Sequence, residues 1–166
     1  MNESWSDCST VAIAAPVWQE TILLVEDDER VRYALQFFLQ NEGFEVIGAG
    51  SVAEAEKYIT VRGPKNISAI ISDIYLDPVT KTPDGYGFYQ SWTAEDPDLP
   101  FILISGDPTV WELPAVRSQE VCFLPKPFNF HELLAAVRSI LDERSAADMV
   151  TRGQNSTKNN SSEKEN

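Results

Sequence analysis

The 166-residue sequence predicts an α/β fold, a doubly wound parallel sheet of five strands with helices on both faces. Three observations predict this class. Short apolar runs, each the length of one buried strand, recur five times along the chain. Segments with helical spacing of apolar residues separate them. Several of the runs end in a polar or charged residue, where open α/β sheets place their ligand sites.

The five predicted strands are short and almost entirely apolar. They span residues 21–26, 44–49, 67–73, 101–105 and 121–124. The third, ISAIISD, ends abruptly in Asp73. A buried charge costs several kcal/mol, roughly, unless it is paired or bound to a metal. We therefore expect Asp73 to have a functional partner.

The first two predicted helices have clear boundaries. The first places its apolar residues at helical spacing and ends at Gly43, which suits a helix terminus. The residues of this apolar face are Val31, Ala34, Leu35, Phe38 and Leu39. Ser51 and Glu54 have the spacing of a capping box and open the second helix.

The later helices are less uniform. The third is predicted from Gly85 to about Glu95. The fourth begins near Asp107-Pro108 but meets Pro114, and an interior proline costs a helix about 3 kcal/mol. We expect this helix to be short or kinked. Asn129 and Glu132 form another capping box, which opens the last helix.

Composition limits the function classes. The formal net charge of −13 argues against direct nucleic-acid binding and against adhesion to anionic lipid. No apolar run is long enough to cross a bilayer, and no signal peptide is evident. Cys8 and Cys122 lie in unrelated contexts and predict free thiols, so a cytoplasmic location is expected. We expect a loose leader over 1–19, one domain over 20–144 and a disordered polar tail or linker over 145–166.

Polar residues stand at the carboxyl ends of four of the five strands. Asp27 and Asp28 follow the first, Asp73 ends the third, Ser105 ends the fourth and Lys126 follows the fifth. Parallel strands bring these ends to one edge of the sheet. Carboxylates gathered there repel one another unless a cation joins them, and Mg²⁺ suits such oxygen ligands. An aspartate, a metal, a hydroxyl and a lysine together form a phosphoryl-transfer set.

The same stretches carry a family resemblance. From Thr21 to about Arg144 the chain resembles a two-component response-regulator receiver domain of the single-domain, chemotaxis type. The matching motifs are VEDD (25–28), SD (72–73), DG (84–85), LISG (103–106) and FLPKPF (123–128). This resemblance implies a flavodoxin-like sheet with the strand order 2-1-3-4-5.

The resemblance also implies a role for each acid. Asp73 would be the phosphoacceptor. Asp28 and Asp73 would ligate Mg²⁺ together with the backbone carbonyl of Tyr75, and Asp27 would act directly or through a water.

Three further residues receive roles from the resemblance. Lys126 would pair with the acceptor and then with the phosphoryl group, and its bond to Pro127 would be cis. Ser105 would move toward the phosphoryl group on activation. Phe123 matches the aromatic residue that switches burial as the hydroxyl moves.

The function implied is a phosphorylation-controlled signalling switch and not a separate enzyme. Its partners would be a sensor histidine kinase or phosphotransfer protein and a downstream protein target. Two alternatives are an interaction module that is never phosphorylated and an aspartate-based phosphatase. Tyr75 argues against the phosphatase, because it occupies the place of the second acid which that chemistry usually needs. No glycine-rich loop follows the first strand, which disfavours a nucleotide-binding enzyme.

Two departures from the family pattern affect the expected output. The loop between Asp73 and Asp84 is longer than usual, and the fourth helix is interrupted at Pro114. We expect the interrupted helix to form an unusual partner surface that includes Trp111.

Overall fold

The computed structural model describes residues 20–77 and 79–158. The predicted leader, 1–19, and the last part of the predicted tail, 159–166, lie outside the described residues.

Five parallel strands form one sheet in the order β2-β1-β3-β4-β5, which confirms the predicted fold class and strand order. Their bounds are β1 Thr21–Val25, β2 Glu45–Ala49, β3 Ala69–Asp73, β4 Phe101–Ser105 and β5 Cys122–Pro125. The register pairs Val25 with Ser72, and Asp73 with Ile104. The carboxyl ends of the central strands therefore lie level with one another along one edge of the sheet.

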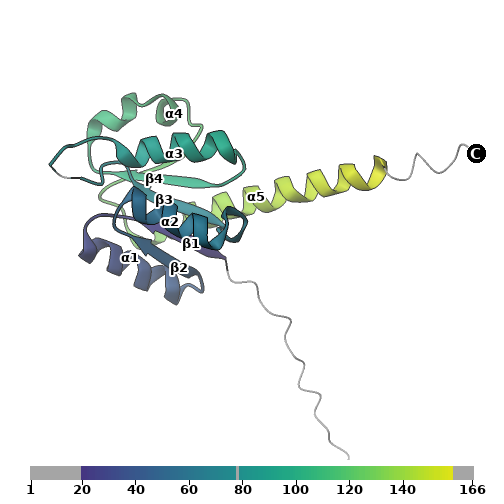
Figure 1. Ribbon diagram of the computed structural model, residues 1–166, viewed down its shortest axis with the longest axis horizontal. Helices are drawn as coiled ribbons and strands as arrows, with labels where there is room; N and C mark the ends of the chain where they lie inside the picture. The colour runs from purple at the N-terminus through teal and green to yellow at the C-terminus, as the bar shows by residue number, and fades with distance from the viewer. Residues whose placement is uncertain (1–19, 78, 159–166) are drawn as a thin grey trace, which may run out of the picture.

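Helices cover both faces of this sheet (Figure 1). On one face lie α1 (Glu29–Asn41) and α5 (Phe130–Lys158), and on the other α2 (Val52–Arg62), α3 (Asp84–Glu95) and α4 (Pro114–Arg117). Two 3₁₀ helices, η1 (Pro64–Asn66) and η2 (Pro108–Glu112), complete the connections. The three layers enclose two apolar clusters, one on each side of the sheet.

Strand β1 shows how the sequence produces this layering. Ile22 and Leu24 point into the cluster under α1 and α5, whereas Leu23 and Val25 point into the other cluster. All four are fully buried. A strand that is covered on both faces needs apolar residues at every position, which is why the run is continuous and does not alternate.

The predicted break in the fourth helix is confirmed. Pro114 becomes the first residue of α4, a position that needs no backbone N–H, and the connection divides into η2 and α4. The N–H of Ala115 donates to the buried Tyr86 hydroxyl at 3.3 Å. The side chain of Tyr86 in α3 therefore satisfies a backbone group at the start of α4.

Residues 145–158, expected to be part of a disordered polar tail or a linker, are helical. Helix α5 continues to Lys158 and extends away from the rest of the domain (Figure 1). Its start is capped reciprocally, because the N–H of Asn129 donates to Glu132 at 2.8 Å and the N–H of Glu132 donates to Asn129 at 3.0 Å. No proline follows that would stop it, and alanine and methionine favour a helix. Within the described residues, no helix is long and apolar enough to span a membrane.

Candidate functional site

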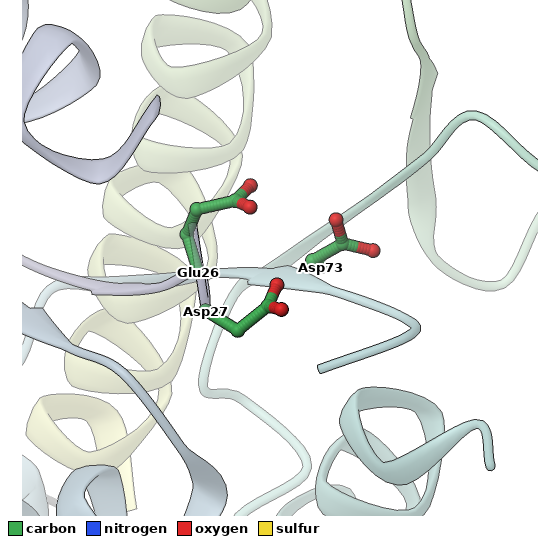
Figure 2. Close-up of side chains that lie close together, drawn as sticks. All are labelled: Glu26, Asp27 and Asp73. Carbon is green, nitrogen blue, oxygen red and sulfur yellow. The ribbon is translucent and has the colours of Figure 1, made fainter. Parts of the chain in front are cut away.

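Three carboxylates meet at the carboxyl edge of the sheet. Glu26 and Asp27 follow directly after β1, and Asp73 is the last residue of the neighbouring β3. Oxygen atoms of the three side chains all lie within 4.8 Å of one another (Figure 2). Carboxylates this close favour a bound cation, and a hard divalent ion takes oxygen ligands of this kind.

Asp28 does not join this cluster, which corrects the expectation that it ligates the metal. Its side chain accepts hydrogen bonds from the N–H groups of Arg30 at 2.8 Å and Val31 at 3.2 Å, and so caps helix α1. The bond from Val31 lowers the pKa of the exposed Asp28 carboxyl most, and the bond from Arg30 lowers it further. Because β1 ends at Val25, the next two acids reach the sheet edge and the third enters the helix cap.

Glu26 is therefore the site residue that the sequence prediction missed. The start of the first helix could have indicated this, because a helix that begins at Glu29 uses residue 28 as its cap and leaves residues 26 and 27 for the site. Only 2% of the Glu26 residue surface is exposed. Burial raises the pKa of Glu26, and the bond from Lys126 opposes part of that rise.

Lys126 joins two of the acids. Its Nζ donates to Glu26 Oε2 at 2.7 Å and to Asp73 Oδ2 at 2.6 Å. Burial alone would lower the pKa of Lys126, but the bonds to Asp73 and Glu26 outweigh it and raise the pKa. The Lys126-Pro127 peptide bond is cis, as the resemblance implied. One ammonium group facing three carboxylates leaves the cluster short of positive charge, which is a second reason to expect a cation there.

Asp73 is held by its backbone surroundings as well as by Lys126. Its Oδ1 accepts a hydrogen bond from the N–H of Tyr75 at 3.0 Å. Helix α3 begins directly against the end of β3, where the N–H of Gly85 donates to the carbonyl of Ile74 at 3.1 Å. A Cβ at position 85 would overlap the Asp73 carbonyl oxygen. The DG pair therefore places α3 where only glycine fits, and this fixes the backbone that carries Asp73.

Ser105 ends β4 beside Asp73 and begins a chain of hydrogen bonds. Its Oγ accepts from the N–H of Asp107 at 3.2 Å. The Thr109 hydroxyl donates to Asp107 Oδ1 at 2.6 Å and lies 3.4 Å from the Tyr75 hydroxyl. The bond from the Thr109 side chain, followed by that from its N–H, lowers the pKa of Asp107. The loops after β3 and β4 are thus joined next to the acid cluster.

Phe123 lies on β5, half-buried and apart from the acids. Its ring meets that of Trp111 edge to face, with centroids 4.8 Å apart and planes at 85°. Of the residues predicted for the site, the structure brings together Asp27, Asp73 and Lys126, and it places Ser105 on the adjacent strand. It places Asp28 in a helix cap and Phe123 against an aromatic neighbour.

The family model described as the response regulator receiver domain matches residues 22–138. The chain belongs to this receiver domain family. Receiver domains act in phosphorylation-dependent two-component signalling, interact with sensor histidine kinases and downstream targets, and bind Mg²⁺ in an acidic pocket. The carboxylate cluster of this receiver domain lies at the carboxyl edge of the sheet.

Curated relatives are much longer proteins. The chain is 32% identical over 127 residues to the sensor kinase CckA of Brucella abortus, a match that covers 75% of this chain and 13% of CckA. It is 29% identical over 125 residues to the C4-dicarboxylate transport transcriptional regulatory protein DctD of Rhizobium meliloti, covering 75% of this chain and 26% of DctD. The chain therefore spans about a quarter or less of the length of these two relatives.

Solved structures show the same fold. A response regulator receiver protein from Sinorhizobium medicae is 28% identical and superposes with a TM-score of 0.64, covering 76% of this chain and 97% of that one. A receiver domain protein from Clostridium thermocellum is 20% identical and superposes with a TM-score of 0.67, covering 77% of this chain and 98% of that one. The second likeness is one of fold alone.

Proposed function

We propose that this receiver domain is a phosphorylation-controlled switch that accepts a phosphoryl group on Asp73. The observation that carries the proposal is the position of the Asp73 carboxylate. It is bonded to Lys126 at 2.6 Å and lies within 4.8 Å of Glu26 and Asp27. A nucleophilic carboxylate beside a lysine and a pair of further acids is the arrangement that aspartyl-phosphate chemistry requires.

In the proposed reaction, a carboxylate oxygen of Asp73 attacks the phosphorus of a phosphohistidine on the donor protein. An O–P bond forms as the P–N bond breaks, and the electron pair of the broken bond stays on the imidazole of the donor. Lys126 faces the charge that develops on the phosphoryl oxygens. The hydroxyl of Ser105, on the neighbouring strand, then donates a hydrogen bond to one of those oxygens.

The acid cluster fits Mg²⁺. Asp27 and Asp73 would hold the ion together with the backbone carbonyl of Tyr75, and Glu26 would act directly or through a water. When bound, the ion neutralises charge on the phosphoryl group. Asp28 has no part in this set, because its carboxylate is committed to the cap of α1.

A groove beside Lys126 suits the donor protein. It lies between α1 and the start of α5, has a volume of about 480 Å³ and is mostly apolar. Its apolar lining is Val31, Ala34, Leu35, Pro127, Phe128 and Phe130. Tyr33 and Phe37 are exposed on the same helix. An apolar groove next to the acceptor fits the apolar face of a helix on a kinase or phosphotransfer protein.

Activation would be read by a protein target through the surface near Phe123. Movement of Ser105 toward the phosphoryl group would release the N–H of Asp107, which now donates to it. Trp111 follows shortly after in η2 and packs on Phe123. The movement of the hydroxyl and the exposure of these two rings would therefore be coupled.

The test is intact mass after incubation with acetyl phosphate and Mg²⁺. The parent should gain one phosphoryl group and Asp73→Asn none. Asp28→Asn is the matched control and should still gain it, because asparagine also caps helices well. Asp27→Asn should lose most Mg²⁺ affinity. A folded parent that binds Mg²⁺ but accepts no phosphoryl group, even from a phosphorylated kinase, would favour the non-phosphorylated interaction module. A phosphoryl group still present on Asp73→Asn would refute the assigned acceptor.

A further inference from the structure

Arg32 of helix α1 contacts the backbone of Glu26 and Asp27, the first two of the three acids that follow β1. Nη1 of Arg32 donates to the carbonyl oxygen of Glu26 at 2.6 Å and to that of Asp27 at 3.3 Å. The guanidinium group is partly buried and packs against the end of β2, where a Cβ added at Gly50 would lie 3.4 Å from Nη1. No carboxylate of the acid cluster is bonded to it, so Arg32 acts on the backbone of these residues.

The Glu26 carbonyl needs this donor because strand β2 has ended. The N–H of Glu26 still donates to Ala49 at 3.0 Å, as a continuing ladder would require. Beyond Ala49 the chain turns, and Ser51 caps helix α2, so β2 offers no further N–H to the Glu26 carbonyl. Burial of an unpaired carbonyl costs free energy, because the group loses its hydrogen bonds to water. Arg32 supplies the donor that the strand no longer provides.

We propose that Arg32 is a positioning residue that orients the Glu26 and Asp27 carboxylates for metal binding, an inference that rests on the proposed function. A residue's carbonyl and side chain share one Cα atom, so fixing the peptide plane limits where the carboxylate points. Helix α1 holds this short loop at two places, through the Asp28 cap and through Arg32. Both acids then face Asp73 (Figure 2).

The charge of Arg32 and its positioning role predict opposite changes in Mg²⁺ affinity when Arg32 is replaced. A guanidinium near the acids repels an incoming cation, so loss of its charge alone would strengthen Mg²⁺ binding. Loss of positioning would weaken Mg²⁺ binding, and removal of groups that orient metal ligands typically lowers affinity by about 10–100-fold. The direction of the change therefore identifies the role.

The experiment measures the Mg²⁺ dissociation constant of the full chain by isothermal titration calorimetry for the parent, Arg32→Met and Arg32→Lys. We expect affinity about 10–100-fold weaker for Arg32→Met and partial recovery for Arg32→Lys, whose ammonium can donate to a carbonyl. Arg138→Met is the matched control. Arg138 pairs with Glu42 on the surface, and its replacement should leave the dissociation constant unchanged.

Thermal unfolding without Mg²⁺ shows whether each variant is folded before titration. If Arg32→Met does not fold, Arg32→Gln replaces it, with the same expected weakening, because its amide ends at the position of the arginine Nε. An unchanged or tighter dissociation constant in the folded variant overturns the inference. A parent that binds no Mg²⁺ refutes instead the metal site of the proposed function, so the two failures are distinguishable.

Discussion

The first and the fourth crossover connections of the sheet are built in opposite ways. After β1 the chain enters α1, a continuous helix of 13 residues whose start is capped by Asp28. After β4 it enters η2, of five residues, and then α4, of four, with Leu113 between them and Pro114 as the first residue of α4. Both connections follow a strand that delivers a site residue to the same edge of the sheet.

The difference separates the fixed part of the site from the part proposed to move. Asp28 accepts bonds from the backbone of α1, and Arg32 of the same helix donates to the carbonyl groups of Glu26 and Asp27, so one continuous helix contacts all three acids. The segment after Ser105 forms only short helical turns, and its side-chain contacts include the Tyr86 hydroxyl and the Trp111–Phe123 pair. The first connection is thus one continuous helix, whereas the fourth consists of two short helical turns.

The largest expected effect comes from replacing one leucine in each of the two connections and comparing the losses in the free energy of unfolding. Leu39 in α1 is fully buried, and Leu39→Ala should lower the free energy of unfolding by about 2–5 kcal/mol. Leu113, between η2 and α4, is only half-buried, so Leu113→Ala should cost about 1–2 kcal/mol. Urea unfolding measures both. Equal losses would mean that the fourth connection is as firmly packed as the first.

Tyr86→Phe sharpens the comparison at one hydrogen bond. It removes the hydroxyl that accepts from the buried N–H of Ala115, which should cost about 1–3 kcal/mol. Amide hydrogen exchange should quicken over α4 more than over α1. Tyr58→Phe is the control, since the Tyr58 hydroxyl makes only an exposed contact to Glu54 at 3.4 Å. Equal acceleration in both helices would show that Tyr86 supports the domain as a whole.

Trp111→Ala should separate binding of the downstream target from phosphorylation of the receiver domain. Loss of the edge-to-face pair should cost about 0.5–1.5 kcal/mol and should weaken binding of the downstream target. The rate of phosphorylation by acetyl phosphate should not change, because Trp111 lies outside the acid cluster. Chemical unfolding and a binding titration measure the two effects, with Trp111→Phe as the conservative control. Target binding equal to that of the parent would exclude Trp111 from the partner surface.

The smallest expected effect is a change in the pKa of the Asp107 carboxyl. The pKa of Asp107 lies below the ordinary value because the ionised carboxylate accepts hydrogen bonds from Thr109. These bonds stabilise the folded protein at pH values above the unfolded pKa of Asp107, and this stabilisation is lost as pH falls through the folded pKa. Thr109→Val removes the hydroxyl and leaves the N–H, so the pKa of Asp107 should rise part of the way toward its ordinary value. An NMR pH titration measures this shift. Asp77, held by its own loop, is the internal control. An unchanged Asp107 pKa would show that the Thr109 backbone alone sets it.

Local signals account for the predicted fold. The capping pairs Ser51–Glu54 and Asn129–Glu132 identify two helix starts, and in both the structure shows the cap bonded to the N–H of its glutamate. The apolar runs need no tertiary information to be recognised as buried strands. Pro114 likewise breaks its helix through the covalent structure of its own ring.

The site was less predictable, because it depends on where neighbouring elements end. Glu26, Asp27 and Asp28 are consecutive acids, and a difference of one residue in the end of β1 decides which of them caps α1. Arg32 has the sequence context of a surface helix residue, and its role arises only because β2 stops at Ala49. The helical continuation of α5 was missed because residues 145–158 are polar and have no apolar stripe at helical spacing.

Helix α5 has a mechanical consequence. Arg144 fastens it to the start of β3 through bonds to the carbonyl groups of Ile67 at 3.0 Å and Ser68 at 2.8 Å. From there to Lys158 the helix rises roughly 20 Å, at about 1.5 Å per residue. Arg144 is therefore a point of attachment from which the rest of the helix extends. Any tilt of α5 against the sheet becomes a larger sideways displacement at the far end of the rod.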